Sequence, residues 1–214
     1  MWNSAIVQSD FLQKEPYNLA KPTYKSELRI LYDDDFIYVS FNLLDPNPNK
    51  LRKPLGRRDD WVSVFGNSSD NIWFGFDTMD DNKNAFSFGV SASNIQLDAQ
   101  VINSNWDTNW KAVWESEVSI NDDGWSVEIK IPFSIFKFNK NKEQIWGLIA
   151  GRNLFSFQEA VMWPGEYNGI QNSVESWGVL EGVNNIPQPK STEFYPYILG
   201  GITPVSYTHL RAHE

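Results

Sequence analysis

The sequence has 214 residues and a net charge of −9, from 18 Lys and Arg against 27 Asp and Glu. An acidic surface repels phosphate backbones, which excludes sequence-independent binding to nucleic acid, and at roughly 150 residues per domain the length suits one sizeable domain. Cysteine is absent, which excludes disulfides and cysteine nucleophiles, and no run of 18 apolar residues could span a bilayer. Aromatic residues make up 15% of the chain, more than core packing alone usually requires.

Alternation of apolar and polar residues predicts short strands in the first half of the chain. Residues 26–44 predict a hairpin, in which Leu28 and Ile30 precede an Asp33–Asp35 turn and a second alternating run follows it. A second pair is predicted at 71–77 and 85–91, and a strand at 95–102 follows a turn at 92–94.

A third hairpin is predicted in the second half, from 113–120 through an Asn-Asp-Asp-Gly turn to an alternating strand that ends near Ile131. Further strands are predicted at 145–155 and 177–180, and single helical turns at 8–14 and 134–138. About eight short strands joined by Asn, Asp and Gly turns are typical of an all-β fold, here an antiparallel β-sandwich of jelly-roll type.

The C-terminal residues are predicted to lie outside this sandwich. Residues 183–204 are interpreted as a linker and the start of a truncated β-rich region, although a last strand of the same domain is the alternative. Residues 205–214 resemble translated read-through and are set aside. Because the two histidines, His209 and His213, lie in that tail, histidine-based catalysis and zinc binding are also excluded.

Several motifs together resemble the carbohydrate-binding module family 9 domain, in the form found at the N-terminus of larger exported bacterial proteins. The resemblance covers roughly residues 2–182, so the domain is taken as 1–182. The matching stretches are LYDDDFIYVSFNLLDPNP (31–48), residues 70–77 and 84–90, NWDTNWKAVWESEVSINDDGWSVEIKIPFSIFKF (105–138) and WGLIAGRN (146–153).

The resemblance implies a non-catalytic β-sandwich that binds sugars between aromatic side chains, sometimes with structural calcium. It also implies a longer natural protein with an export signal, placed in the periplasm, the outer membrane or outside the cell, and engaged in carbohydrate catabolism or uptake. The given chain shows no signal peptide at its start. In longer relatives the domain precedes a region that looks like a C-terminal β-barrel, which would be its partner.

Tryptophans in polar loops are the candidate sugar contacts, because indole rings pack on the C–H face of a pyranose. Trp61 follows a charged connection, Trp163 lies in a Pro- and Gly-rich loop near Asn172, and Trp106 and Trp110 are flanked by Asn and Asp. The alternative for each is a ring packed over the rim of the sandwich. The tryptophans within predicted strands are assigned to the core or a sheet face: Trp73, Trp114, Trp125 and Trp146.

Charged candidates leave two interpretations open. Arg152 could donate two hydrogen bonds to sugar hydroxyls, or it could form an ion pair with a strand carboxylate such as Glu128. Asp77, Asp80 and Asp81 crowd one loop and could supply oxygen ligands to calcium, although the spacing lacks the Gly and Glu of an EF-hand and turn chemistry is the alternative.

Two other functions compete with sugar binding. A structural or interaction module of an outer-membrane protein would keep the fold and bind no sugar. A glycoside hydrolase would need two carboxylates about 5 to 9.5 Å apart, and Glu115 and Glu117 share a strand face at about 7 Å. Since acids on one exposed face are common, the sequence favours non-catalytic carbohydrate binding with no required cofactor.

Overall fold

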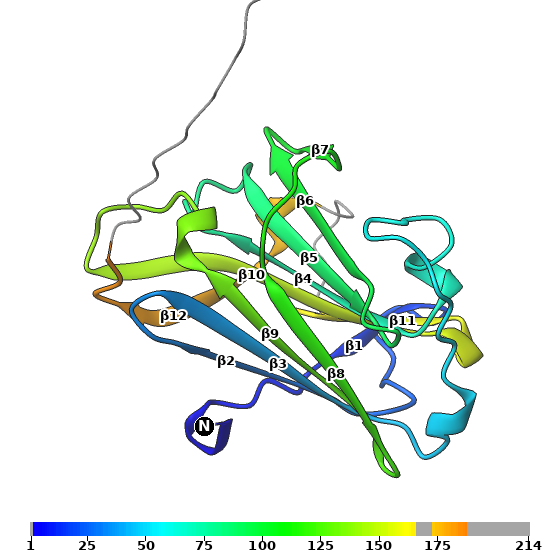
Figure 1. The fold of residues 1–214 in the computed structure, drawn as a ribbon. Coiled ribbons are helices and arrows are strands. Elements are labelled where there is room, and N and C mark those ends of the chain that lie inside the picture. Colours follow the sequence, from blue (N-terminus) through cyan, green and yellow to red (C-terminus); the bar gives the residue numbers. More distant parts are fainter. Residues whose placement is uncertain (1, 166–172, 188–214) are drawn as a thin grey trace, which may run out of the picture.

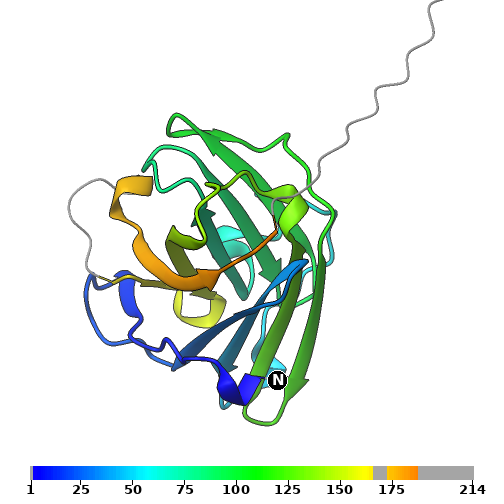
Figure 2. The same cartoon turned by 90° about the vertical axis from the view of Figure 1, so that its left-hand side faces the viewer.

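The computed structural model describes residues 2–165 and 173–187, which form two antiparallel sheets packed face to face (Figures 1 and 2). The all-β sandwich predicted from the alternation is therefore confirmed. In spatial order, the larger sheet consists of β1 (Leu12–Glu15), β11 (Glu159–Trp163), β10 (Glu143–Leu154), β4 (Asn71–Asp77), β5 (Ala85–Ser91), β6 (Gln96–Ile102) and β7 (Asn105–Asp107), and β12 (Gly178–Asn184) also pairs with β10. The smaller sheet consists of β2 (Ser26–Tyr32), β3 (Phe36–Leu44), β9 (Gly124–Pro132) and β8 (Glu115–Asn121).

Side-chain alternation decides which residues meet between the sheets. In β4, Ile72, Phe74 and Phe76 are fully buried against the other sheet, so Trp73 and Gly75 face outward. In β9, Trp125, Val127, Ile129 and Ile131 are buried from the opposite side, as the sequence predicts.

The core between the sheets is rich in aromatic rings. Phe74 stacks on Phe88 with ring centroids 5.4 Å apart, and Phe76 meets the indole of Trp146 edge to face at 5.9 Å. Both arrangements are favourable for aromatic quadrupoles. Much of the aromatic excess therefore serves the core, which leaves the rings on other surfaces to be explained.

Three short strands are not evident from the sequence. Residues 8–14, predicted as a helical turn, instead lead into β1, which begins at Leu12 and pairs with β11. The Pro- and Gly-rich stretch around Trp163 begins within β11, and β7 forms a three-residue strand beside β6. The helical turn predicted at 134–138 is a single 3-10 turn at Phe133–Ile135.

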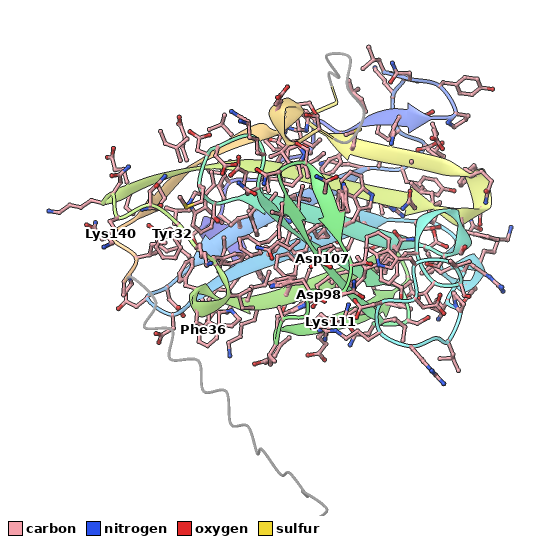
Figure 3. All side chains as sticks on the ribbon, turned by 90° about the horizontal axis from the view of Figure 1, so that it is seen from above. Tyr32, Phe36, Asp98, Asp107, Lys111 and Lys140 are labelled. Carbon is pink, nitrogen blue, oxygen red and sulfur yellow. The ribbon has the colours of Figure 1, made fainter. Side chains whose placement is uncertain are left out.

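The sandwich extends past its predicted end at residue 182. Strand β12 runs to Asn184, and Val183 and Ile186 are buried in the main core. The Tyr32 hydroxyl, at one end of the sandwich (Figure 3), donates to the Gly182 carbonyl and accepts from the Asn184 N–H, both at 3.0 Å, which ties β12 to β2. The predictions for residues 188–214 lie outside the described residues. Within the described part of the chain, no helix is long and apolar enough to cross a membrane.

Candidate functional site

A cavity of about 580 Å³ lies on the outer face of the larger sheet. Two small apolar clusters also lie on this face, one around Phe65 and Leu97 and one where Trp177 packs on Val101 and Val174. The residues that line the cavity are Lys14, Glu15, Trp61, Phe65, Gly66, Asn71, Trp73, Ser87, Leu97, Trp106, Ile149, Asn153, Ala160 and Trp177. Four of the ten tryptophans therefore meet at one hollow.

The floor of the cavity is the indole of Trp73 on β4, which lies between two glycines of the neighbouring strands. Trp73 pairs with Gly151 of β10 on one side and Gly89 of β5 on the other. A Cβ atom at Gly151 would lie 2.3 Å from the Trp73 ring, and one at Gly75 would lie 2.5 Å from the ring of Trp177. Both indoles occupy space that only glycine leaves free, so each ring lies close against the sheet.

The rim is formed by a second pair of indoles. Trp61 comes from the loop before β4, and Trp106 comes from β7. Their ring centroids are 6.3 Å apart at an interplanar angle of 85°, and the two residues remain 39% and 44% exposed. An edge-to-face pair of this kind is favourable and leaves ring surface available to a ligand.

Polar groups in the cavity are few, and several already have partners. Asn71 Nδ2 donates to the carbonyls of Gly66 and Ser69, and Asn153 Nδ2 donates to Asn71 Oδ1 at 2.8 Å. Within the described residues, Asn153 Oδ1 and the four indole N–H groups make no hydrogen bond. Lys14 and Glu15, at the end of β1, supply the charged groups of the lining. The cavity can therefore stack on a ring and exchange a small number of hydrogen bonds with it.

A model of the carbohydrate family 9 binding domain-like family matches residues 1–153, more than two thirds of the chain. The chain belongs to this family. The family match ends within β10, so it contains Trp61, Trp73 and Trp106, whereas Trp177 lies beyond it. Family 9 modules are non-catalytic.

Solved structures share the fold. A family 9 carbohydrate-binding module from Caldicellulosiruptor kristjanssonii in complex with cellotriose is 14% identical, with a TM-score of 0.59 over 91% of this chain and 90% of that one. The same organism's module in complex with glucose is 13% identical, with a TM-score of 0.57 and the same coverage. A protein from Bacteroides uniformis ATCC 8492 is 12% identical over 84% of this chain and 87% of that one, with a TM-score of 0.63. No curated protein matches the chain.

In this family 9 domain, the cavity includes two of the four predicted loop tryptophans, Trp61 and Trp106. Trp110 instead packs against Phe86, with ring centroids 5.3 Å apart, at the margin of the core. Trp163 also packs on the core, because it follows the inward-facing Val161 by two residues on β11, and its ring covers Gly178. Trp110 and Trp163 therefore agree better with the alternative, a ring packed over the sandwich, than with a sugar contact. Asn172 lies outside the described residues.

Arg152 does not line the cavity. Its neighbours Gly151 and Asn153 face outward, so the Arg152 side chain points between the sheets and is fully buried. Its Nη1 donates to the Leu44 carbonyl at 3.0 Å, and its Nη2 lies 4.0 Å from the Asp45 carboxylate. Burial lowers the pKa of Arg152 to about 10, although the negative charges of Asp70 and Asp45 oppose this shift.

The ion-pair alternative for Arg152 therefore applies to Asp45, just after β3, and not to Glu128. Glu128 is exposed on the outer face of the smaller sheet, where its carboxylate accepts a hydrogen bond from the Trp2 indole at 2.6 Å. Glu115 and Glu117 lie on that same face, and Glu115 is 3.5 Å from Lys130. The two carboxylates considered for hydrolysis are therefore far from the aromatic cavity and on the other sheet.

The acidic loop after β4 is organised by hydrogen bonds within the turn. Asp77 accepts hydrogen bonds from the backbone N–H groups of Met79, Asp81 and Asn82, and Asp81 accepts from those of the two residues before Ala85. Asp80 is exposed and has a left-handed backbone, with φ of 52°. Within the described residues, no three acidic or histidine side chains are grouped to hold a metal. These carboxylates serve the turn, which was the alternative.

Two cavity residues, Trp73 and Trp177, were not among the predicted contacts. Trp73 was assigned to the core or a sheet face because it lies within a strand, and Trp177 was assigned to a strand. The signal that could have found Trp73 is the sequence Ile-Trp-Phe-Gly-Phe, in which both Trp73 and Gly75 alternate with phenylalanines that must face the core. A tryptophan on the opposite face of such a strand is available to a ligand.

Proposed function

We propose that this domain binds carbohydrate, a mono- or oligosaccharide, in the cavity on the outer face of the larger sheet. The observation that carries the proposal is the arrangement of four indoles around one hollow of about 580 Å³. Membership of a family of carbohydrate-binding modules supports it, as do similar folds solved with cellotriose and with glucose.

Recognition would combine stacking with a limited set of hydrogen bonds. A pyranose ring placed on Trp73 would present its C–H face to the indole, while Trp177 would contact its edge. Asn153 Oδ1 would accept from one sugar hydroxyl, and the indole N–H groups would donate to others. A longer saccharide would continue toward Trp61 and Trp106 at the rim.

No cofactor is required in this proposal. The cavity lining within the described residues contains a single carboxylate, Glu15, so the donor set for a calcium ion is not assembled there. Treatment with a chelator is expected to leave the sugar affinity unchanged. A loss of affinity that added calcium restores would contradict this part of the proposal.

We also propose that the domain works as a module of a larger exported protein engaged in carbohydrate catabolism or uptake, with a β-barrel region as its partner. The support is the family resemblance alone. Fractionation of cells that express the natural gene would test it, and recovery of the protein in the cytoplasm would contradict it.

The proposal is tested by titrating the protein with glucose and cellotriose, following tryptophan fluorescence and binding heat. We expect dissociation constants of roughly mM to µM, about −4 to −8 kcal/mol. Trp73→Ala is expected to weaken binding by about tenfold or more, because the ring provides the central stacking surface.

The matched control is Trp2→Ala, since Trp2 contacts Glu128 on the opposite sheet. This variant should bind as the unchanged protein does. Equal affinities for Trp73→Ala and Trp2→Ala, with both proteins folded by near-ultraviolet circular dichroism, would reject the assigned cavity. No binding by the unchanged protein to either sugar would count against the function.

A further inference from the structure

We propose that a cluster of four charged residues, Arg58, Asp59, Asp98 and Lys111, positions the rim tryptophans Trp61 and Trp106. The inference rests on the proposed function, because it concerns the same cavity. The cluster joins three segments: the loop that carries Trp61, strand β6, and the stretch that follows Trp106. Asp98 and Lys111 are labelled in Figure 3.

Asp59 fixes the loop of Trp61 to the sheet. Its N–H donates to the Gln96 carbonyl at 3.0 Å, and its Oδ1 accepts from the Asp98 N–H at 2.9 Å. Trp61 in turn donates its own N–H to the Asp59 carbonyl at 3.0 Å. Asp59 has a left-handed backbone, with φ of 62°, which an aspartate adopts at some cost and which these hydrogen bonds offset.

Lys111 connects that loop to the segment of Trp106. Its Nζ donates to the Thr108 carbonyl at 2.7 Å, two residues beyond Trp106, and it lies 2.9 Å from the Asp59 Oδ2. The Lys111 ammonium group therefore contacts the backbone just after Trp106 and also the Asp59 carboxylate, just before Trp61. The link joins the loop of Trp61 to the segment that follows Trp106.

Asp98 is the buried centre of the cluster. Its side chain is fully buried, and its Oδ2 accepts from the Trp114 indole at 2.9 Å, the Ala112 N–H at 3.3 Å and the Arg58 guanidinium. Arg58 also donates to the Ala112 carbonyl at 2.8 Å and lies over the Trp114 ring at 5.5 Å. A buried carboxylate is stable only when it is paired, so Asp98 requires its cationic neighbours to stay in place.

The pairing of β7 with β6 holds the backbone of Trp106, and further support is needed to fix the Trp61 and Trp106 rings against each other. Trp61 and Trp106 are 39% and 44% exposed, so packing fixes their rings only in part, and a ring pair alone contributes about 0.5 to 1.5 kcal/mol. Ordering the loop of Trp61 and the segment after β7 costs more than this. We therefore assign the cluster a positioning role: it touches no ligand, and it acts through the loop that carries Trp61 and the segment that follows Trp106.

The test uses Lys111→Met, which keeps the aliphatic length and removes the charge, and Lys111→Arg, which restores a cation. Two indoles this close couple their electronic transitions and give a paired circular-dichroism signal, which is isolated by subtracting the spectrum of Trp106→Phe made in each background. We expect Lys111→Met to lose this signal and to weaken cellotriose binding about two- to fivefold, the usual effect of one partly exposed ion pair. Glucose affinity should change less, because Trp73 and Trp177 are not held by the cluster.

Lys130→Met is the matched control, since Lys130 is a partly exposed lysine paired with Glu115 on the other sheet. It should keep both the signal and the affinities, and Lys111→Arg should recover most of what Lys111→Met loses. The positioning role is rejected if Lys111→Met keeps the paired signal and its cellotriose affinity stays within the error of the control. If the unchanged protein binds neither sugar, the proposed function fails, and the spectroscopic comparison alone decides the positioning role.

Discussion

At the scale of single residues, the floor of the cavity depends on two positions in β10 and β5 that have no side chain, Gly151 and Gly89. Trp73 has a glycine directly beside it on both neighbouring strands, so its indole can lie over Gly151 while Phe65 lies over Gly89. A glycine weakens a strand, because it adds no packing and loses more backbone entropy on folding. The stability lost there is offset by two aromatic rings that cover the bare backbone.

Gly151→Ala is expected to destabilise the protein by about 1 to 3 kcal/mol, because the new Cβ overlaps the Trp73 ring. It should also weaken sugar binding, since the ring must move. In a Trp73→Ala background the same substitution should cost much less, because the obstructing ring is gone. Denaturant unfolding of the unchanged protein, the two single variants and the double variant gives the coupling energy between positions 73 and 151. Additive effects would show that the contact between the Trp73 ring and Gly151 does not affect stability.

At the scale of elements, the hairpin between β4 and β5 is held by one buried carboxylate. Asp77, at the end of β4, accepts N–H groups from three later residues of the loop, and Asn82 has a left-handed backbone with φ of 59°. Burial raises the pKa of Asp77, an effect that these hydrogen bonds only partly oppose. The loop is therefore organised around a group whose charged form is disfavoured in the folded state.

This shift predicts the sign of a pH effect. Since the pKa of Asp77 is higher in the folded than in the unfolded protein, its contribution to stability is greatest below the usual Asp value of about 3.9 and is lost as the pH rises through the folded value. The free energy of unfolding of the unchanged protein, relative to Asp77→Asn, should therefore increase as the pH is lowered from 7 to 4. Asp80→Asn, an exposed change in the same loop, is the control. A constant difference across this range would contradict the expectation.

At the scale of the whole molecule, β10 organises the larger sheet. Residues 147–153 of β10 pair with β4 on one edge, while β11 and β12 share the other edge end to end. The chain after β12 then returns to the core through Ile186. Strand β12 is therefore an integral part of the sandwich, and the Tyr32 hydroxyl fastens it to the second sheet.

Ile186→Ala tests this integration. Removing a buried isoleucine side chain should lower the free energy of unfolding by about 2 kcal/mol. Ile6→Ala, at a site that is 89% exposed, should change it by less than about 0.5 kcal/mol. Equal stabilities in urea unfolding would show that the segment beyond β12 does not belong to the folded unit.

The sequence predicts the long strands well because each carries a complete alternating pattern with a turn on both sides. The strands β4 and β5 begin and end where the alternation predicts. The alternation pattern does not predict β1, β7 and β11. Strands of three to five residues carry too little periodicity and owe their conformation to a neighbouring strand.

The candidate site was predicted in part for a related reason. Polar flanks indicate Trp61 and Trp106, which line the cavity, but they also indicate Trp110 and Trp163, which pack on the core. The direction of the Arg152 side chain follows from the register of β10 with β4, which local composition does not contain. Likewise, the charges of Arg58 and Asp98 are 40 residues apart, and only the fold brings them together.

The glycines beneath the indoles of Trp73 and Trp177, Gly151 and Gly75, have a consequence for the evolution of the family. A substitution at position 151 or 75 cannot be accepted while the ring above it stays, so each glycine and its tryptophan must be exchanged together or not at all. Among relatives, Gly151 should covary with Trp73 and Gly75 with Trp177. A lineage that acquires a side chain at either glycine should also have abandoned that ring, and its preference for ligands should have diverged at the same step.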